Sequence, residues 1–466
     1  MSKNTEYIDG LNYDLKKLLT VNLQTETQPD SNLENRQIFP GSVRVCKKTP
    51  HGVMKDLTDN SLLDPTQGVI FPGAILKQNE NLALGLPTPY TFARSPLTIR
   101  VLLPGLEEKG NAIIDSPTNV SVQTAIDKIV DYWHNNFGNN DYVVPVRAFS
   151  NSCKAYTKEQ IGIQLGFGMQ LDKFSTTASL NYKSNVESTT TFKVFRQIYY
   201  SVIVEEPKES GDFFTENVIL NPKNMAESDP PGFVRSVNYG RTIIVQMTTK
   251  KQLRDIDASL TLEYSLGGKD DKIDADTKAK YESIKNDSSF TAIVLGGGSE
   301  STGILIEEID KINDAISHGL SFSKKTPAVP VSYVVADVKS RQNSTMRLST
   351  EYVETICEMY YNRSITLKHG GAYVANFLID WFETDSNGQP VSRHYESGNV
   401  TASWVTKLDF PGDATNIKIT LHDYTGIAWS PVYKLFLTFP VLDGNKVVEC
   451  TGTTLNPYLQ DITNNH

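Results

Sequence analysis

The residue types that commonly carry catalysis or bind metals are present in this chain, but their spacing forms no recognisable site. The seven histidines show no HExxH motif or other paired spacing, and no two acidic residues are marked by spacing as a general acid and base. Gly296-Gly297-Gly298 followed by Gly303 resembles a phosphate loop only superficially, because Ile304 stands where the lysine belongs. The sequence therefore predicts a protein that is not an enzyme and needs no metal or cofactor.

The four cysteines lie far apart in the sequence and form no CxxC pair. Such spacing indicates neither a zinc site nor a small disulfide framework. Free buried thiols are therefore expected at all four positions, which are Cys46, Cys153, Cys357 and Cys450.

Length and charge narrow the class of protein further. A chain of 466 residues is long for one hydrophobic core, so roughly three or four domains are expected. A net charge of −9 and a pI near 5.4 argue against a nucleic-acid partner and offer no general attraction to anionic lipid. No apolar run reaches the roughly 18 residues of a transmembrane helix, so entry into a bilayer would require a β-barrel.

Two segments, 161–171 and 256–266, alternate apolar residues with polar residues or glycine. Each is about as long as the roughly 9–11 residues that a tilted strand needs to cross a bilayer with one face toward lipid. Each is followed by a polar stretch and a partner strand, 186–198 after the first and 284–295 after the second. Two membrane hairpins are therefore predicted. Their apolar positions are Ile161, Ile163, Leu165, Phe167, Met169, Leu171, Ile256, Ala258, Leu260, Leu262, Tyr264 and Leu266.

This alternation is also typical of half-buried strands in an ordinary antiparallel sheet, so the pattern alone leaves that alternative open. The second segment fits a helical period as well, because Leu253, Ile256, Leu260 and Tyr264 recur at near-helical spacing. A sequence that fits both periods is what a conversion from helix to strand requires.

The elements around these segments are mainly β. Helical periodicity is confined to a few stretches, chiefly 124–137 and 305–320, and the segment from about 361 onward has strands every 8–14 residues, which predicts a separate β-sandwich. The stretch 20–70 is polar and rich in turns, and it fits an elongated connector better than a core. Other runs rich in β-branched residues are 98–103, 198–204, 242–247, 292–295 and 330–336.

Extended local matches, in unchanged order from about residue 10 to the end, resemble the cholesterol-dependent (thiol-activated) cytolysins. Nearly the whole chain is covered. The matching stretches are NYDLKKLLT (12–20), FPGAIL (71–76), LPGL (103–106), SPTNVSVQTAIDKIVDYW (116–133), VPVRA (144–148), RQIYYSV (196–202), VNYGRTI (237–243), FTAIVLGG (290–297), STEYVET (349–355), HGGAYVANF (369–377), YTGIAW (424–429) and GTTLNP (452–457).

The resemblance implies an α+β, mainly β, elongated four-domain cytolysin. A central bent antiparallel sheet is flanked by helical bundles, and a β-sandwich follows at the C-terminus. The implied boundaries are 5–19, 56–147, 198–240 and 316–344 for domain 1, 20–55 and 345–360 for domain 2, 148–197 and 241–315 for the hairpin-bearing domain 3, and 361–466 for domain 4.

Two features of domain 3 are implied to act in assembly. An aromatic pair that fixes strand register between neighbouring subunits matches Tyr200 and Phe290, a task that suits directional ring stacking. A glycine pair at a strand bend matches Gly296 and Gly297, where the missing Cβ would let an edge element rotate away and expose the strand edge to the next subunit.

Two loops of domain 4 are implied to meet the membrane. Thr454 and Leu455 match the family's sterol-recognition pair, with a hydroxyl for the sterol 3-OH beside an apolar side chain for its rings. The signature undecapeptide, usually ECTGLAWEWWR, stands here as DYTGIAWSPVY. Its residues are Asp423, Tyr424, Thr425, Gly426, Ile427, Ala428, Trp429, Ser430, Pro431, Val432 and Tyr433.

The undecapeptide departs from the family pattern in ways that matter for binding. Its cysteine is Tyr424, so thiol sensitivity should be absent; two tryptophans are replaced by Pro431 and Val432, so interfacial anchoring should be weaker. The final arginine, which in the family helps to couple binding to hairpin release, is Tyr433. Pro431 also occurs in members that use a protein receptor, although their tyrosine-pair and Arg-Ser motif is not evident around 377–395.

The function implied is a secreted pore former that binds cholesterol in a target-cell membrane and forms a homo-oligomer there. No nucleic-acid partner is implied. Two alternatives stay open: a relative that uses a protein or glycan receptor, a partner or proteolytic activation, and a non-lytic lectin-like binding protein. The N-terminus, MSKNTEYIDG, lacks the apolar stretch of a signal peptide. Either a leader has been removed or export follows another route.

Overall fold

The structure, a computed structural model, describes residues 2–25, 34–64, 68–138, 146–173, 180, 182, 184, 188–250, 275–296, 305–318, 322–324, 326–426 and 432–464. The chain divides into two compact units: unit 1 is Met1–Gln28 with Pro50–Val353, and unit 2 is Pro29–Thr49 with Glu354–His466. Two long strands, β3 (Ser42–Leu57) and β14 (Met346–Tyr361), each begin in one unit and end in the other. The finer division into four domains stays a prediction.

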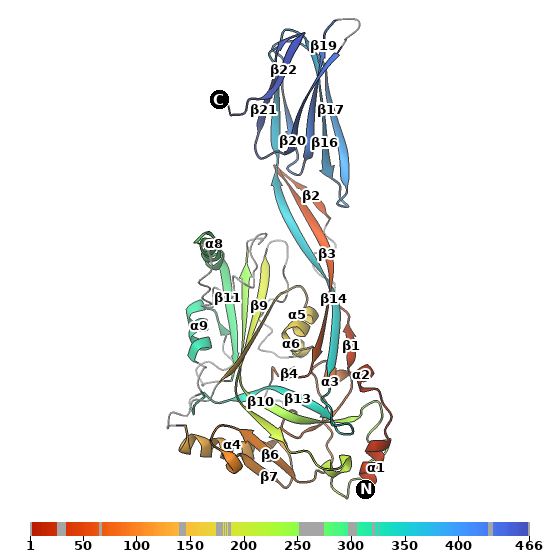
Figure 1. The fold of residues 1–466 in the computed structure, drawn as a ribbon, viewed down its shortest axis with the longest axis vertical. Helices are drawn as coiled ribbons and strands as arrows, with labels where there is room; N and C mark the ends of the chain where they lie inside the picture. Colours follow the sequence, from red (N-terminus) through yellow and green to blue (C-terminus); the bar gives the residue numbers. More distant parts are fainter. Residues whose placement is uncertain are drawn as a thin grey trace. The chain divides into compact units, whose positions relative to one another are not determined.

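A mainly antiparallel sheet forms the centre of unit 1 (Figure 1). Its order is β12-β11-β10-β9-β6-β7, with β8 paired to β9, β5 and β13 paired to β10, and β4 paired to β13. The runs of β-branched residues form strands, as the sequence predicts, and all of these strands belong to this sheet. Its strands are β4 (Asn60–Ser61), β5 (Ile75–Lys77), β6 (Leu97–Leu102), β7 (Asn111–Ile114), β8 (Arg147–Lys154), β9 (Thr189–Val204), β10 (Pro231–Thr249), β11 (Ser288–Leu295), β12 (Leu305–Ile306) and β13 (Val329–Asp337).

A bulge interrupts the long β9–β10 pairing at Tyr239 and Gly240, where the register shifts. A Cβ on Gly240 would lie 1.9 Å from the carbonyl oxygen of Gln197, so this close approach of two backbones requires glycine. Bulges of this kind bend a strand and increase its local twist. The bend of the sheet therefore has a local cause in the sequence.

The first of the two predicted helices is confirmed, and the second is confirmed for part of its length. The 124–137 periodicity corresponds to α4 (Asn119–Asn136), which begins with a capping box between Thr118 and Ser121 and buries Ile126 and Trp133 against the sheet. The 305–320 periodicity gives β12 followed by α9 (Ile309–His318). No helix in the described ranges is both long enough and apolar enough to span a membrane. The other helices are α1 (Lys3–Gly10), α2 (Leu15–Leu18), α3 (Glu80–Ala83), α5 (Lys158–Leu165), α6 (Gln170–Lys173), α8 (Ala275–Asn286) and the 3-10 turns η2 (Glu107–Gly110) and η4 (Ser210–Phe213).

The first alternating segment, 161–171, is not a strand in this structure. It forms the end of α5, a turn and the start of α6. A capping box between Thr157 and Gln160 starts α5, and Gly166, at φ +85°, ends it in the left-handed conformation. The reading of this stretch as an ordinary half-buried strand is therefore wrong. The second segment, 256–266, lies outside the described residues.

Unit 2 contains the predicted C-terminal β-sandwich. One sheet has the order β18-β15-β21-β22 and the other β17-β16-β19-β20, and their inner faces share an apolar core that includes Phe377, Ile419 and Val448. Arg36 of β2 (Arg36–Phe39) binds Asp413 with two hydrogen bonds of 2.8 and 3.0 Å. The strands are β15 (Arg363–His369), β16 (Val374–Thr384), β17 (Pro390–Val400), β18 (Val405–Phe410), β19 (Thr415–Tyr424), β20 (Val432–Val441), β21 (Lys446–Thr453) and β22 (Asn456–Asp461). In unit 1, β1 (Thr20–Leu23) pairs in parallel with β14.

The expectation of four free thiols is wrong for two of them. Cys46 of β3 and Cys357 of β14 form a disulfide, although 311 residues separate them in the sequence. Cys153 and Cys450 are free and buried, as expected. Sequence spacing could not find the disulfide, because only the pairing of two distant strands brings its cysteines together.

Thiol counting tests the disulfide directly. Protein unfolded in denaturant without reductant should react with two equivalents of an alkylating reagent, at Cys153 and Cys450, because the other two sulfurs are bonded to each other. After reduction all four cysteines should react. Peptide mass mapping assigns the sites, and four labelled cysteines before reduction would contradict the pairing.

Candidate functional site

Thr454 and Leu455 form the two-residue turn of a hairpin between β21 and β22. Thr453 and Asn456 face each other across the turn, and Leu455 is 63% exposed. Gly452 has φ +94°, and a Cβ there would lie 2.2 Å from the carbonyl oxygen of Asn456. Only glycine fits this position. The turn that follows presents the half-buried Thr454, which carries a hydroxyl, beside the exposed apolar side chain of Leu455.

The undecapeptide-like loop joins β19 to β20. Tyr424 pairs with Val432 and Asp423 with Tyr433 at the two ends of the loop, and both tyrosines are partly exposed, at 37% and 41%. Residues Ile427, Ala428, Trp429, Ser430 and Pro431 lie outside the described residues.

One short segment, residues 372–374, pairs with both this loop and the hairpin that carries the Thr454–Leu455 turn. Ala372 forms a bridge with Thr453 beside the turn, and Val374 pairs with Tyr424 at the end of β19. Both candidate loops therefore lie at the same end of the sandwich, which we call the sandwich tip. Scattered exposed apolar side chains are normal, but a group of them at one end indicates an interaction surface. Exposed apolar residues of the tip are Val374, Val405, Tyr424, Tyr433, Leu455 and Tyr458.

A buried polar cluster lies beneath the sandwich tip. His369 accepts a hydrogen bond at Nδ1 from the Gly371 amide, 3.1 Å, and its Nε2 lies 2.9 Å from the Tyr373 carbonyl oxygen, so Nε2 carries the proton. The Tyr373 hydroxyl donates to the Thr451 carbonyl, 3.1 Å, and Asp423 is fully buried. Burial lowers the pKa of His369 and raises the pKa of Asp423 to about 6.

The two aromatic residues proposed for subunit register are both buried. Tyr200 is 5% exposed and stacks on Tyr239, with ring centroids 5.1 Å apart. Phe290 is 7% exposed and packs with Met247 and Ile312 in the core beside α9. Neither ring lies at the surface in this state, and the structure does not bring them together.

The exposed aromatic residue of this region is Phe149, which the sequence reasoning missed. Phe149 is 53% exposed and lies in β8, a strand whose residues 147–152 are all exposed and which pairs with β9 alone in the described part of the chain. An edge strand presents unpaired N–H and C=O groups to another chain. Strand order identifies this edge, and no local sequence signal does so.

On the opposite side of the sheet, β12 covers only part of the edge of β11. Its two residues pair with Ala292 and Ile293. Gly296, just after β11, has φ +83°, and a Cβ there would lie 2.7 Å from Val329 Cγ2 and 2.8 Å from the Gly240 carbonyl oxygen. The second glycine of the pair, Gly297, lies outside the described residues.

A buried arginine anchors α9 to the sheet next to that edge. The Arg241 guanidinium, 3% exposed, donates to Gln197 Oε1 at 2.5 Å, to the Ile316 carbonyl at 3.1 Å and to the Ala315 carbonyl. The Gln197 amide also donates to the Ile316 carbonyl, 3.0 Å. The last carbonyls of a helix have no partner within it and carry partial negative charge, so this cation satisfies and stabilises the end of α9.

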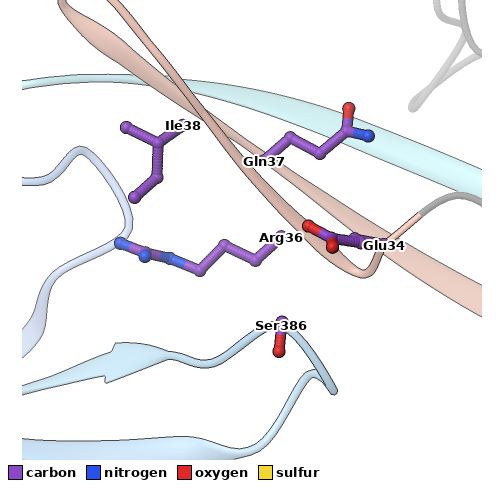
Figure 2. Close-up of a pocket in the computed structure, with 5 residues that line it drawn as sticks. All are labelled: Glu34, Arg36, Gln37, Ile38 and Ser386. Carbon is purple, nitrogen blue, oxygen red and sulfur yellow. The ribbon is translucent and has the colours of Figure 1, made fainter.

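A pocket of about 410 Å³ lies in unit 2 (Figure 2). Arg36, Gln37 and Ile38 of β2 line it together with Glu34 and Ser386. Among these described lining residues, the only cation is Arg36, and its guanidinium is already bound by Asp413. Within the described ranges, no group of three or more His, Cys, Asp or Glu side chains is placed to hold a metal ion.

Comparison with known proteins extends over the whole chain. Residues 4–360 match the model of the thiol-activated cytolysin family, and residues 364–458 match that of the thiol-activated cytolysin β-sandwich domain. Tetanolysin of Clostridium tetani is 31% identical over 442 residues, which cover 91% of this chain and 80% of tetanolysin. Perfringolysin O of Clostridium perfringens is 31% identical over 424 residues, covering 89% and 83%.

Solved structures agree with this fold. The crystal structure of listeriolysin O superposes with a TM-score of 0.77 at 23% identity, covering 98% of this chain and 95% of that one, which supports the fold alone. A disulfide-locked mutant of intermedilysin with human CD59 superposes with a TM-score of 0.67 at 27% identity and covers 98% of each chain.

Replacing Arg241 tests the anchoring of α9. Arg241→Met should speed amide hydrogen exchange over 309–318 by about tenfold or more, because hydrogen bonds to charged groups contribute about 1.5–3 kcal/mol each. Arg347→Met, which breaks an ion pair with Asp56 elsewhere in unit 1, is the matched control and should leave that helix unchanged. Equal exchange of α9 in Arg241→Met and wild type would show that the guanidinium does not anchor it.

Proposed function

The chain belongs to the thiol-activated cytolysin family of pore-forming toxins, and from this premise we propose how its parts bind a membrane, assemble and insert. As a member of that family it is a pore-forming cytolysin and not an enzyme. In our proposal the sandwich tip binds the target membrane, subunits oligomerise there, and each inserts two β-hairpins into a shared transmembrane barrel. The exposed apolar residues gathered at the tip are the observation that carries this proposal.

Thr454 and Leu455 are proposed to recognise a sterol, most simply cholesterol. The turn offers a hydroxyl that can bond the sterol 3-OH and an exposed leucine that can contact the rings. Transfer of an exposed leucine from water into an apolar environment is favourable by about 1.5–3 kcal/mol. Tyr424, Tyr433 and Trp429 of the undecapeptide-like loop would lie in the interface beside it, where aromatic residues are favoured.

Assembly is proposed to proceed by strand addition. The exposed edge strand β8 of one copy would pair with β11 of the next once β12 and α9 move away from it. Gly296 and Gly297 would permit that movement. Phe149 is the exposed ring available to stack on a neighbour's Phe290 when α9 departs, whereas Tyr200 would first have to leave its stack on Tyr239.

Insertion is proposed to use the segments 161–171 and 256–266. In the first, conversion of the helix–turn–helix segment α5–α6 to an extended strand would place all six alternating apolar residues on one face, toward lipid. In this structure they are buried or half-buried instead, so the segment has to leave its core before it can insert.

A protein receptor is the second candidate for membrane recognition. The undecapeptide-like loop retains a single tryptophan, Trp429, and the intermedilysin structure with human CD59 shows a related chain together with a protein. Because weaker interfacial anchoring favours a second attachment, a protein on the target cell is the alternative partner of the sandwich tip. In either mode the protein is proposed to act at the membrane of a target cell after secretion.

Truncation of the exposed leucine tests sterol-dependent binding. Leu455→Ala should weaken binding to cholesterol-containing vesicles by about 30-fold, because about 2 kcal/mol of apolar transfer is lost. The control is Val441→Ala, which removes a side chain of similar exposure, 59%, at the opposite end of β20. Vesicle co-sedimentation measures both, and equal losses for the two variants would refute recognition by the tip.

Truncation of the exposed phenylalanine tests the register of assembly. Phe149→Ala should leave membrane binding unchanged and slow vesicle leakage by about 2- to 10-fold, since aromatic stacking contributes about 0.5–1.5 kcal/mol at each subunit contact. Ile113→Ala, an exposed residue of β7 in the same sheet, should leak at the wild-type rate. Unaltered leakage in Phe149→Ala would exclude this ring from the subunit contact.

A further inference from the structure

A carboxylate occupies a core position directly beneath the sandwich tip. Asp423 follows Ile417, Ile419 and Leu421 at every second residue of β19, and all four are buried, so its side chain points to the inner face of the sheet. Asp423 itself is 0% exposed, and among the described residues neither carboxylate oxygen has a hydrogen-bond partner. Buried polar groups are almost always paired, so an exception requires an explanation.

The groups that face Asp423 from the surrounding elements do not supply a charge. Ala375 of β16 and Tyr433 of β20 are its partners in the sheet, and Tyr373 and Cys450 are the ionisable groups whose electrostatics it affects. Burial raises the pKa of the Cys450 thiol to about 11 and raises that of Tyr373. Burial also lowers the pKa of His369, whose Nε2 is hydrogen-bonded to the Tyr373 carbonyl oxygen.

Asp423 is therefore a member of this cluster whose charge changes in the mildly acidic range, and within the part of the structure that is described it has no partner for that charge. Desolvation raises its pKa to about 6, so the folded protein binds a proton that the unfolded chain, with an ordinary carboxyl pKa, has released. The sign follows from linkage: this end of the sandwich is most stable at low pH and loses stability as the pH rises from about 4 to about 6. Above that range the carboxylate is ionised and unpaired in an apolar core, a costly state.

Contacts lead from Asp423 to the exposed turn. Tyr373, which shares the buried cluster with Asp423, donates its hydroxyl hydrogen to the Thr451 carbonyl in β21, and Ala372 bridges Thr453 next to the turn. A movement of Asp423 toward water at the end of β19 would disturb Tyr373 and, through it, the hairpin that carries Thr454 and Leu455.

We propose that Asp423 is a proton-sensitive link between the end of β19 and the β21–β22 turn. When ionised, Asp423 moves out of the core and loosens the tip for membrane contact; when protonated, it stays buried and keeps the tip closed. The effect on membrane contact rests on the function proposed above, whereas the effect of Asp423 on the tip itself does not require a membrane. Neutral surroundings therefore favour binding, and acidification opposes it.

Hydrogen exchange of the free protein tests the link without any membrane. Protection factors, which are corrected for intrinsic exchange at each pH, should rise about tenfold over 446–461 between pH 7.5 and pH 5.0 in the wild type. Asp423→Asn resembles the protonated form, so it should show high protection at both pH values. Asp409→Asn replaces a carboxylate whose side chain is 79% exposed, and it should keep the wild-type profile.

Vesicle leakage supplies the second readout. With phosphatidylcholine and cholesterol vesicles, the wild type should leak several-fold faster at pH 7.5 than at pH 5.0, and Asp423→Asn should be slow at both. A flat wild-type exchange profile, or an Asp423→Asn profile identical to wild type, would overturn the link. Should Asp423→Asn fail to fold, Asp423→Glu serves instead, because it keeps the charge and should keep the pH dependence.

The two readouts separate this inference from the proposed function. A pH-dependent exchange profile without any leakage at either pH would retain the link and refute the membrane role. Leakage that depends on Leu455 but not on pH would refute the link and retain the membrane role.

Discussion

Close backbone contact, permitted by glycine, holds the segment on which the proposed function depends. A Cβ on Gly162 would lie 1.9 Å from the Gly168 carbonyl oxygen, and a Cβ on Gly168 would lie 2.5 Å from that of Leu84. These contacts fold α5 and α6 so tightly that Ile161, Leu165 and Phe167 share one core with residues of β9, β10 and β11. The glycines that interrupt the apolar positions thus allow the compact helical form, and the same two-residue alternation would give a strand one apolar face.

The edge of β11 and the sandwich tip are alike in one respect. At each of them, a buried polar group restrains a surface that is proposed to act later. Arg241 satisfies the end of α9 beside the partly covered edge of β11. Asp423 lies unpaired beneath the hairpin that presents Leu455. The hydrogen bonds of Arg241 stabilise the closed form, whereas the buried carboxylate of Asp423 is destabilising once it ionises.

The sequence predicted the mainly β fold, the helix now seen as α4 and the C-terminal sandwich, because capping residues and regular strand spacing are local signals. For 161–171 the alternation also allowed an ordinary half-buried strand, and that alternative is wrong, since residues buried on several sides at once satisfy either period and local spacing cannot show the surrounding core. The Cys46–Cys357 disulfide and the exposed edge position of Phe149 depend on strand order, which no local pattern contains. The burial of Tyr200 had the same origin: its ring faces Tyr239 of the adjacent strand.

The most direct measurement locks α5 to β4 and follows leakage. A Cβ on Gly166 would lie 3.4 Å from Ser61 Oγ, so Ser61→Cys/Gly166→Cys brings two thiols together within unit 1. Because Gly166 has φ +85°, Gly166→Cys alone controls for the strain that any side chain causes there. The oxidised double variant should bind cholesterol vesicles and fail to leak, and reduction should restore leakage. Wild type with reductant controls for loss of the native disulfide. Leakage at the wild-type rate from protein shown by mass spectrometry to be cross-linked would contradict release of the 161–171 segment.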